Sequence, residues 1–230
     1  MMKKKIGIVG GISSASTIQY YRTITDLYFK QFNDYYYPEI IIDSLDFQYF
    51  MDLKNENKTQ GYTDYIVKSA NNLEKAGADF IIMASNSPHS VFEEVEKQTN
   101  LPMISIVDTT AKYASRNNLK KVLLTGIKHT MQSDFYQKGF NKSGMEVIVP
   151  SEEHQNKIND IIFNELVINK FSNETKKQFL GIINSYDVDG VILGCTELPL
   201  LVNQNDTNIK LLDTLSLHCD AALQFSVALS

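Results

Sequence analysis

The sequence predicts an α/β fold built from two parallel-sheet domains. Short apolar runs alternate with amphipathic stretches along the chain, and this alternation is typical of parallel α/β sheets. Three stretches of the first half recur in the same order in the second half, which indicates a duplicated unit. We therefore expect two pseudo-symmetric α/β domains with the functional site between them.

The expected strands are short runs rich in β-branched residues, and most are near-continuously apolar, as strands covered on both faces are. Longer stretches with helical periodicity separate them. Strands are expected at residues 5–9, 39–43, 80–83, 103–107, 122–125, 146–149, 191–193 and 210–212. Helices are expected at residues 17–28, 64–76, 135–140, 156–168, 176–186 and 215–225.

The repeat has three parts that keep their order. Residues 4–10 (KKIGIVG) match 120–126 (KKVLLTG), residues 79–86 (DFIIMASN) match 189–196 (DGVILGCT), and residues 107–109 (VDT) match 212–214 (LDT). In this register Ser85 corresponds to Cys195. A polar run at 115–119 precedes the second copy, so the expected domains are 1–115 with about 210–230, and 116–209.

Composition and charge exclude several classes of protein. A chain of 230 residues is long enough for a sizeable core, and a formal net charge of -5 gives no electrostatic footprint for nucleic acid or an anionic membrane. No stretch approaches the roughly 20 apolar residues that span a bilayer. The two cysteines have no metal-ligand spacing and no disulfide framework. We expect a cytoplasmic protein whose partner is a small molecule.

Cys195 has the setting of a reactive residue. It directly follows an expected strand and precedes a turn or helix, and open α/β sheets bind ligands beyond the carboxyl ends of their strands. A thiol at a helix N-terminus is acidified from its free pKa of about 8.5 and becomes a base or nucleophile. Glu197 is then a proton acceptor or an orienting carboxylate. In the alternative interpretation, Cys195 is a small buried residue and Glu197 an exposed cap.

Three motifs carry a family resemblance that runs nearly end to end. Residues 194–198 (GCTEL), 85–89 (SNSPH) and 7–13 (GIVGGIS) together resemble the aspartate/glutamate racemase superfamily. The resemblance implies an amino-acid racemase that uses no pyridoxal phosphate or other cofactor and removes and replaces the α-proton with two opposed acid/base residues. It also implies an aspartate or glutamate substrate and a homodimer.

The chain departs from that family at one of the two acid/base positions. Both are usually cysteines, but here Ser85 takes the place of the first, and a hydroxyl is a far poorer base than a thiolate. The resemblance places Cys195 on the face that takes the proton from an L-amino acid. Ser85, through a bound water, would return a proton on the other face. We therefore expect a racemase biased toward L-substrates.

Substrate recognition requires donors for carboxylates. Asn86, Ser87, Thr130 and Thr196 are candidate hydrogen-bond donors, Ile12 would line the pocket after the glycine turn, and His89 would hold its own loop. By resemblance Lys157 would face a carboxylate, although a helical lysine is also typical of a solvated surface. The arginine that many aspartate racemases place after their second strand has no counterpart between Asp43 and Lys54.

Two other functions remain open from the sequence. One-cysteine members of the same superfamily resemble arylmalonate decarboxylases, which need a single proton donor after carbon dioxide leaves. The other is a racemase-like binding protein without turnover. Polar residues at Ser85 and Asn86, together with Lys157, favour an amino-acid substrate over an aryl one.

Overall fold

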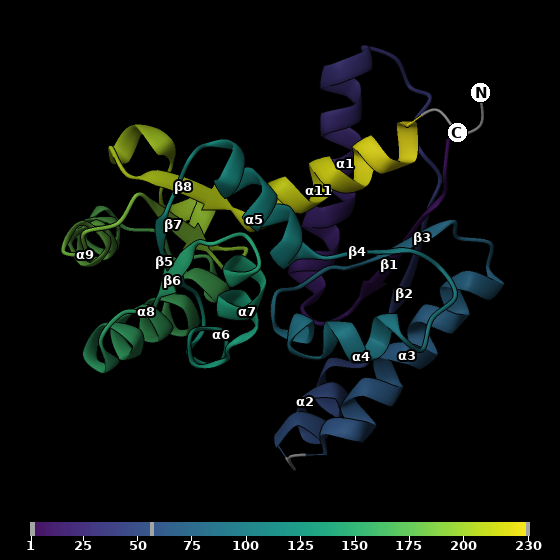
Figure 1. Ribbon diagram of the computed structural model, residues 1–230, viewed down its shortest axis with the longest axis horizontal. Coiled ribbons are helices and arrows are strands. Elements are labelled where there is room, and N and C mark those ends of the chain that lie inside the picture. The colour runs from purple at the N-terminus through teal and green to yellow at the C-terminus, as the bar shows by residue number, and fades with distance from the viewer. Residues whose placement is uncertain (1–2, 56–57, 229–230) are drawn as a thin grey trace. The chain divides into compact units, whose positions relative to one another are not determined.

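A computed structural model describes residues 3–55 and 58–228 of the chain, which form alternating strands and helices (Figure 1). The strands are β1 (Ile6–Gly10), β2 (Ile40–Ser44), β3 (Phe80–Met83), β4 (Met103–Ile104), β5 (Lys121–Thr125), β6 (Glu146–Ile148), β7 (Gly190–Leu193) and β8 (Lys210–Asp213). The α-helices are α1 (Ser14–Phe32), α2 (Phe47–Asn55), α3 (Thr59–Lys75), α4 (Phe92–Glu96), α5 (Ile106–Arg116), α6 (Lys128–Gln132), α7 (Phe135–Asn141), α8 (Glu152–Asn164), α9 (Asn173–Asn184), α10 (Leu198–Leu201) and α11 (Thr214–Val227). Short 3-10 turns are η1 (Ser87–Val91), η2 (Leu166–Ile168) and η3 (Gln204–Asp206). No helix in the described ranges is both long and apolar enough to cross a membrane.

The chain folds into two compact units, Met1–Ile106 with His218–Ser230, and Val107–Leu217. The expected limits, 1–115 with about 210–230 and 116–209, differ from these units at both boundaries. Strand β8 pairs with β7 and so belongs to the second unit. Most of α5 also belongs there, because Val107 packs so closely on Gly139 that a Cβ on that glycine would lie 2.3 Å from Cγ1 of Val107.

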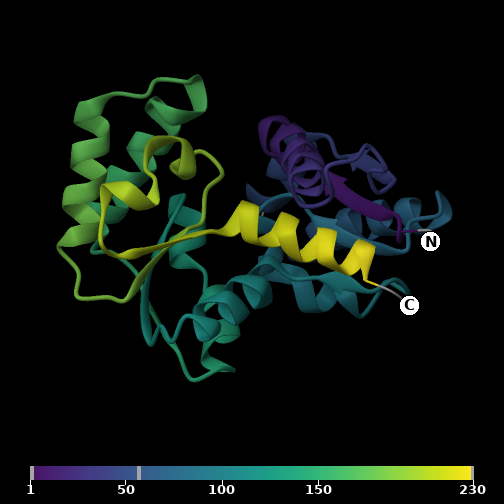
Figure 2. The same cartoon turned by 90° about the horizontal axis from the view of Figure 1, so that it is seen from above.

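Unit 1 is a four-stranded parallel sheet in the order β2-β1-β3-β4. Alternate strand residues face opposite sides, so Val9, Ile81 and Met83 pack in one core cluster with the apolar side of α3. On the other side the ring of Phe80 contacts Phe225 of α11 at 4.8 Å between centroids. Figure 2 shows α11 running beside α1 in this unit. Both faces of the sheet are therefore covered, as the apolar strands predict.

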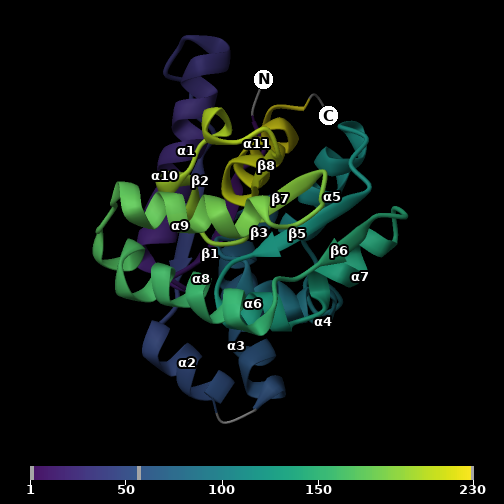
Figure 3. The same cartoon turned by 90° about the vertical axis from the view of Figure 1, so that its left-hand side faces the viewer.

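Unit 2 repeats that architecture with a sheet in the order β6-β5-β7-β8, again parallel throughout. Helices α8 and α9 lie next to each other in this unit (Figure 3). Their apolar faces share a core cluster with Leu123, Val191 and Leu193. The predicted α/β class, with two parallel-sheet domains, is confirmed.

Two of the three repeated sequence stretches have the same register in the two units. Ile6 lies opposite Phe80 in unit 1, and their sequence counterparts Val122 and Gly190 lie opposite each other in unit 2. A side chain completes the likeness, because the carboxylate of Asp79 accepts the backbone N–H of Lys5. In unit 2, Asp189 accepts those of Lys120 and Lys121 at 2.7 and 2.9 Å.

The third correspondence, residues 107–109 with 212–214, is wrong. Ile104 pairs with Ile82 in unit 1 as Leu212 pairs with Ile192 in unit 2, so Ile104 is the structural counterpart of Leu212. The strand expected at 103–107 ends at Ile104, and the chain turns into α5 at Ile106. The buried residues at 106, 107, 110, 111 and 114 follow helical periodicity, which prevails over the β-branched run.

Two buried histidines hold the junction between β4 and α5. The backbone N–H of Ile106 donates to Nε2 of His89 at 3.1 Å, and Nε2 of His218 donates to the carbonyl of Ile104 at 2.8 Å. The hydroxyl of Tyr20 donates to Nδ1 of His218 at 2.9 Å. Burial lowers the pKa of His89 to about 3, with a smaller effect of His218, and burial lowers the pKa of His218 to about 4. Both rings are neutral at pH 7.

This arrangement predicts a loss of stability in weak acid. The pKa values of both histidines lie below the unfolded value of about 6.5, so their contribution is complete above that pH and falls as the pH drops through the window toward 3–4. Between pH 7 and pH 5 each histidine should cost about 2 kcal/mol of unfolding free energy. Urea unfolding measures this loss. Between pH 7 and pH 5 the His218→Gln variant should lose about 2 kcal/mol less unfolding free energy than the unmodified protein.

The control is Cys219→Ser, which changes the neighbouring residue of α11 and removes no group that titrates in this window. That variant should lose as much unfolding free energy between pH 7 and pH 5 as the unmodified protein does. If His218→Gln loses as much unfolding free energy between pH 7 and pH 5 as the unmodified protein does, His218 is not a neutral, buried imidazole.

Candidate active site

Cys195 stands at the carboxyl edge of the unit 2 sheet because the end of β7 is pressed against β5. The N–H of Gly194 donates to the carbonyl of Thr125 at 2.8 Å, and a Cβ on Gly194 would lie 2.6 Å from the same oxygen. Only glycine allows that approach. The hydroxyl of Thr214 also donates to the carbonyl of Leu193 at 2.9 Å. The next residue, Cys195, is therefore fixed at the sheet edge and is half-buried.

The thiol of Cys195 is hydrogen-bonded to a carboxylate. Its Sγ donates to Oε2 of Glu197 at 2.9 Å, and the hydroxyl of Thr196 donates to the same oxygen at 2.8 Å. Burial raises the pKa of the Cys195 thiol well above its ordinary value, and the negative charge of Glu197 and the hydrogen bond to it raise that pKa further. The resting thiol is therefore protonated.

The expected acidification of this thiol by a helix N-terminus is wrong. Helix α10 is a single turn that starts at Leu198, and a helix of that length has little dipole to offer. The backbone N–H groups of Thr196 and Glu197 lower the pKa of Cys195, but by less than burial and the carboxylate raise it.

A protonated thiol beside a carboxylate can still act as a base. When a cation approaches, it favours the thiolate, and the thiol proton has an acceptor 2.9 Å away. An amino-acid substrate carries such a cation in its α-ammonium group. The pair in unit 2 is thus arranged to hold a proton that leaves the sulfur, and to return it.

Thr130 provides a second polar group at the same edge. It is almost fully buried on α6, and its Oγ1 has no hydrogen-bond partner in the described part of the chain. Its Cγ2 would lie 3.5 Å from a Cβ on Gly194, which places it beside the residue before Cys195. A buried hydroxyl without a partner is costly. A polar ligand at the sheet edge would satisfy it.

The corresponding edge of unit 1 is built in the same way around Ser85. The N–H of Ala84 donates to the carbonyl of Val9 at 2.9 Å, and the hydroxyl of Ser16 donates to the carbonyl of Ala84 at 2.7 Å. Nδ1 of His89 donates to the carbonyl of Ser85 at 2.9 Å, which confirms that His89 holds this loop. Ser85 is half-buried, as Cys195 is.

The two edges differ in the chemistry they offer. In the register that aligns Ser85 with Cys195, Ser87 takes the position of Glu197. Unit 1 thus has a hydroxyl where unit 2 has a thiol, and a second hydroxyl where unit 2 has a carboxylate.

The glycine turn after β1 is a close backbone contact. Gly11 has a φ of 81°, and a Cβ there would lie 2.2 Å from the carbonyl oxygen of Leu45. Its N–H donates to the hydroxyl of Thr17 at 2.9 Å. Ser13, at the start of α1, has a φ of 114°, a strained conformation for a residue with a side chain. Ile12 lies between them and is buried in the unit 1 core.

The remaining predicted residues lie in three places. Asn86 and Ser87 are buried at the start of η1, directly after Ser85. Thr196 contacts Glu197 as described above. Lys157 is exposed on α8, and no ion pair or hydrogen bond of its ammonium group is found among the described residues. The prediction that it meets a substrate carboxylate stays a prediction.

Sequence reasoning missed the two hydroxyls that hold the strand ends, those of Ser16 and Thr214. Each side chain donates to a carbonyl one or two residues before Ser85 or Cys195. The signal was available, because both residues lie in the first turn of a helix that directly follows a strand or its glycine turn. The partner carbonyls, however, are distant in sequence.

Comparison with known proteins agrees with this fold. The Asp/Glu/Hydantoin racemase family model matches residues 9–222. The chain is 29% identical over 215 residues to the broad specificity amino-acid racemase RacX of Bacillus subtilis, covering 91% of this chain and 92% of RacX. It is 28% identical to a glutamate racemase of Aquifex pyrophilus, covering 60% of this chain and about half of that protein (53%).

Among solved structures, an aspartate racemase homologue from Pyrococcus horikoshii is similar over nearly the whole chain. It is 38% identical, the match covers 98% of this chain and 100% of that chain, and the TM-score is 0.90. The chain is therefore a two-domain α/β protein with the same strand order in both sheets and a thiol–carboxylate pair at the edge of the second sheet. The chain belongs to the Asp/Glu/Hydantoin racemase family and is an amino-acid racemase.

The contact between Cys195 and Glu197 predicts a specific titration of the thiol. In the Glu197→Gln variant the pKa of Cys195 should fall, because the negative charge that opposes the thiolate is removed. The rate of iodoacetamide alkylation against pH measures this pKa. The inflection of the unmodified protein should lie above that of a free thiol, and that of the variant should lie lower.

Two controls accompany the titration. Cys195→Ser should abolish the titrating alkylation, since Cys219 is fully buried. Glu174→Gln, at an exposed position of α9, should leave the inflection unchanged. An inflection that does not move in Glu197→Gln would contradict the contact.

Proposed function

We propose that this protein racemises aspartate, glutamate or both without pyridoxal phosphate, by removing and returning the α-proton. The observation that carries the proposal is the 2.9 Å contact between the Cys195 thiol and the Glu197 carboxylate. It supplies a base that can form when a cationic substrate binds, and an acceptor for the thiol proton. An α-proton needs such a base, since a hydroxyl alone is too weak.

The proton path has two steps with different groups. The thiol proton of Cys195 passes to Glu197, and the thiolate sulfur takes the α-proton of the L-amino acid, leaving a carbanion stabilised by its carboxylate. Ser85, through a bound water, returns a proton to the opposite face. At the edge of unit 2, the orphaned hydroxyl of Thr130 and the hydroxyl of Thr196 bind carboxylate oxygens of the substrate.

The difference between the two edges makes the enzyme directional. Cys195 has a carboxylate to accept its proton, and Ser85 has none at the matching position. Abstraction from an L-substrate is therefore faster than abstraction from a D-substrate. Because the equilibrium constant between enantiomers is one, kcat/KM is equal in the two directions, so the bias appears in kcat at saturating substrate and not in the final ratio of enantiomers.

The substrate class is supported by the names of similar proteins. A glutamate racemase and an aspartate racemase homologue are among them, and Lys157, exposed on α8, is the cation proposed for a second carboxylate. RacX is described as having broad specificity, so the same assay should include neutral amino acids. A cytoplasmic location remains a prediction from the sequence.

Loss of the thiol should abolish racemisation. Circular dichroism of L-aspartate and L-glutamate follows the loss of optical activity. Cys195→Ser should lower the rate by at least about 100-fold, the typical share of one acid/base group. Cys219→Ser is the matched control, because this buried residue belongs to unit 1 and should leave the rate unchanged.

Two results would contradict the proposed reaction. If Cys195→Ser racemises as fast as the unmodified protein, the thiol is not the base. If the unmodified protein instead releases carbon dioxide from an arylmalonate and leaves amino acids intact, the decarboxylase alternative is correct.

Restoring a thiol at the serine position should change the directional bias. In Ser85→Cys the initial rate at saturating D-aspartate or D-glutamate should rise relative to that at saturating L-enantiomer, because a thiolate replaces a hydroxyl. The comparison of the two initial rates in the same circular dichroism assay measures the effect. Ser90→Cys, at an exposed position of η1, is the control and should leave the ratio unchanged. No gain on D-substrates would contradict the role of Ser85.

A further inference from the structure

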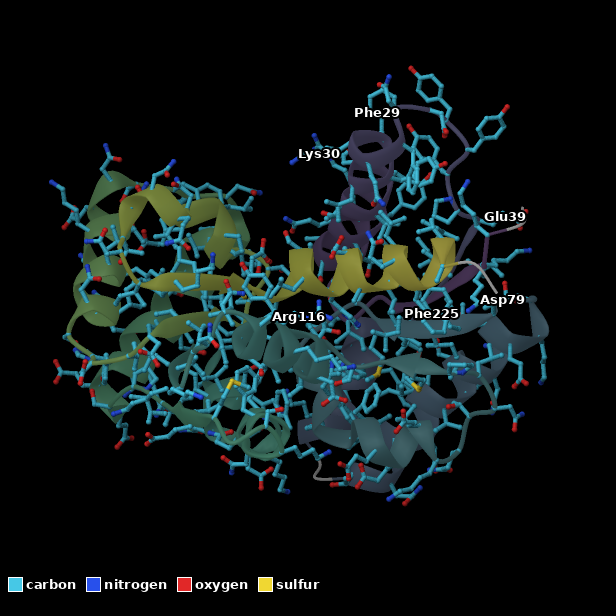
Figure 4. The ribbon with its side chains drawn as sticks, turned by 45° about the horizontal axis from the view of Figure 1, so that its top comes forward. Phe29, Lys30, Glu39, Asp79, Arg116 and Phe225 are labelled. Atoms are coloured by element: carbon cyan, nitrogen blue, oxygen red, sulfur yellow. The ribbon has the colours of Figure 1, made fainter. Side chains whose placement is uncertain are left out.

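Three buried hydroxyl groups meet inside unit 2. Tyr136, on α7, has no exposed surface, and a buried phenol normally finds a polar partner. Its hydroxyl is hydrogen-bonded to the side chains of Thr110 and Thr214, which are also buried. Thr110 lies on α5, whose last residue, Arg116, is labelled in Figure 4, and Thr214 begins α11. The three hydroxyls therefore join three helices.

The hydrogen bonds among these hydroxyls run in one direction. The hydroxyl of Thr214 donates to the carbonyl of Leu193 at 2.9 Å, and a threonine hydroxyl has a single proton. Toward Tyr136 the oxygen of Thr214 must therefore accept, so the phenol donates to it. The only proton of the phenol is then used, and Thr110 donates to Tyr136. Hydrogen bonds aligned in this way strengthen one another.

This chain of hydroxyls ends on the peptide group that precedes Cys195. The carbonyl of that group belongs to Leu193 and accepts from Thr214, while its N–H belongs to Gly194 and donates to the carbonyl of Thr125 at 2.8 Å. A peptide group is planar, so contacts at its carbonyl and at its N–H together fix its plane. The direction in which the backbone continues to Cys195 is fixed with it.

Unit 1 is built differently at the matching position. Strands β4 and β8 pair in the same register, so Ile106 takes the place of Thr214, and its side chain has no hydroxyl. The carbonyl of Met83, the counterpart of Leu193, instead accepts the N–H of Ser85 at 2.9 Å. The hydroxyl that reaches this carbonyl from the following helix thus accompanies the thiol and not the serine.

We propose that Tyr136 is a positioning residue for Cys195. Through Thr214 it fixes the peptide group before the cysteine, and it thereby keeps the thiol within hydrogen-bond distance of Glu197. The phenol acts through these groups and takes no part in the proton transfer itself. The inference rests on the proposed function, because the thiol is the base of that reaction, but the setting of the thiol can be measured without a substrate.

Loss of this support should change both the thiol and the reaction. Burial and the charge of Glu197 raise the pKa of the Cys195 thiol, so a thiol that moves away from the carboxylate and toward water has a lower pKa. Misplacing a reacting group by about 1 Å can cost about 100-fold in rate. The loss should appear in kcat and not in KM, because the base acts only as the transition state forms.

Removal of single hydroxyls tests the proposal. Tyr136→Phe and Thr214→Val each delete one hydroxyl and nearly keep the buried volume, whereas Thr214→Ser keeps the hydroxyl. In the iodoacetamide titration the first two variants should show a lower pKa of Cys195 than the unmodified protein, and Thr214→Ser should retain the unmodified value. In the circular dichroism assay with L-aspartate and L-glutamate, Tyr136→Phe and Thr214→Val should lower kcat by at least about 10-fold at unchanged KM.

The matched control is Tyr186→Phe, which also deletes a tyrosine hydroxyl with two partners in unit 2. That hydroxyl accepts the N–H of Ser151 and donates to Nδ1 of His154, both at 2.8 Å. Its loss should leave the pKa of Cys195 and kcat unchanged. If Tyr136→Phe does not fold, the comparison of Thr214→Val with Thr214→Ser decides.

Two results would overturn the positioning role. One is an unmodified pKa of Cys195 in both Tyr136→Phe and Thr214→Val, and the other is an equal shift of that pKa in Tyr186→Phe. Failure of the proposed function looks different. If the unmodified protein racemises neither amino acid while the pKa of Cys195 falls in Tyr136→Phe and Thr214→Val, the reaction is wrong and the positioning of the thiol stands.

Discussion

The position of the reactive sulfur depends on one backbone hydrogen bond, from Gly194 to the carbonyl of Thr125. It draws the end of β7 against β5 so closely that a side chain at Gly194 has no room. The chain must leave the sheet at the next residue, and that residue is Cys195. The contact with Glu197 follows from this placement, because the short turn before α10 returns the carboxylate to the sulfur.

Unit 1 makes the equivalent backbone hydrogen bond, from Ala84 to the carbonyl of Val9, with an alanine in place of the glycine. Two sheets with the same strand order, the same register and the same aspartate contact at their amino ends present equivalent edges. Because the two sheets share strand order and register, the residues at the two edges can be compared one by one. A thiol and a carboxylate at one edge correspond in sequence to two hydroxyls at the other, so the two edges differ in their side chains.

Much of the fold could be predicted from the sequence, and the failures have physical causes. The eight strands found in the described residues were all expected, because near-continuous apolar runs bounded by turn residues are a strong signal for buried parallel strands. The end of β4 was misplaced, since Ile106 and Val107 are β-branched residues that pack on a helix. The assignment of β8 to unit 2 depends on pairing with β7, which local pattern does not encode. The resemblance placed Cys195, but the direction of its pKa shift depends on burial and on the orientation of Glu197.

Exchange of the α-proton with solvent tests the role of Cys195 and Glu197 most directly. The protein is incubated with L-aspartate or L-glutamate in deuterium oxide, and deuterium at Cα is followed by proton NMR. The account predicts incorporation by the unmodified protein and none by Cys195→Ser, with slower incorporation by Glu197→Gln because the thiol proton loses its acceptor. Binding of both amino acids without any deuterium at Cα, or incorporation by Cys195→Ser at the unmodified rate, would contradict it.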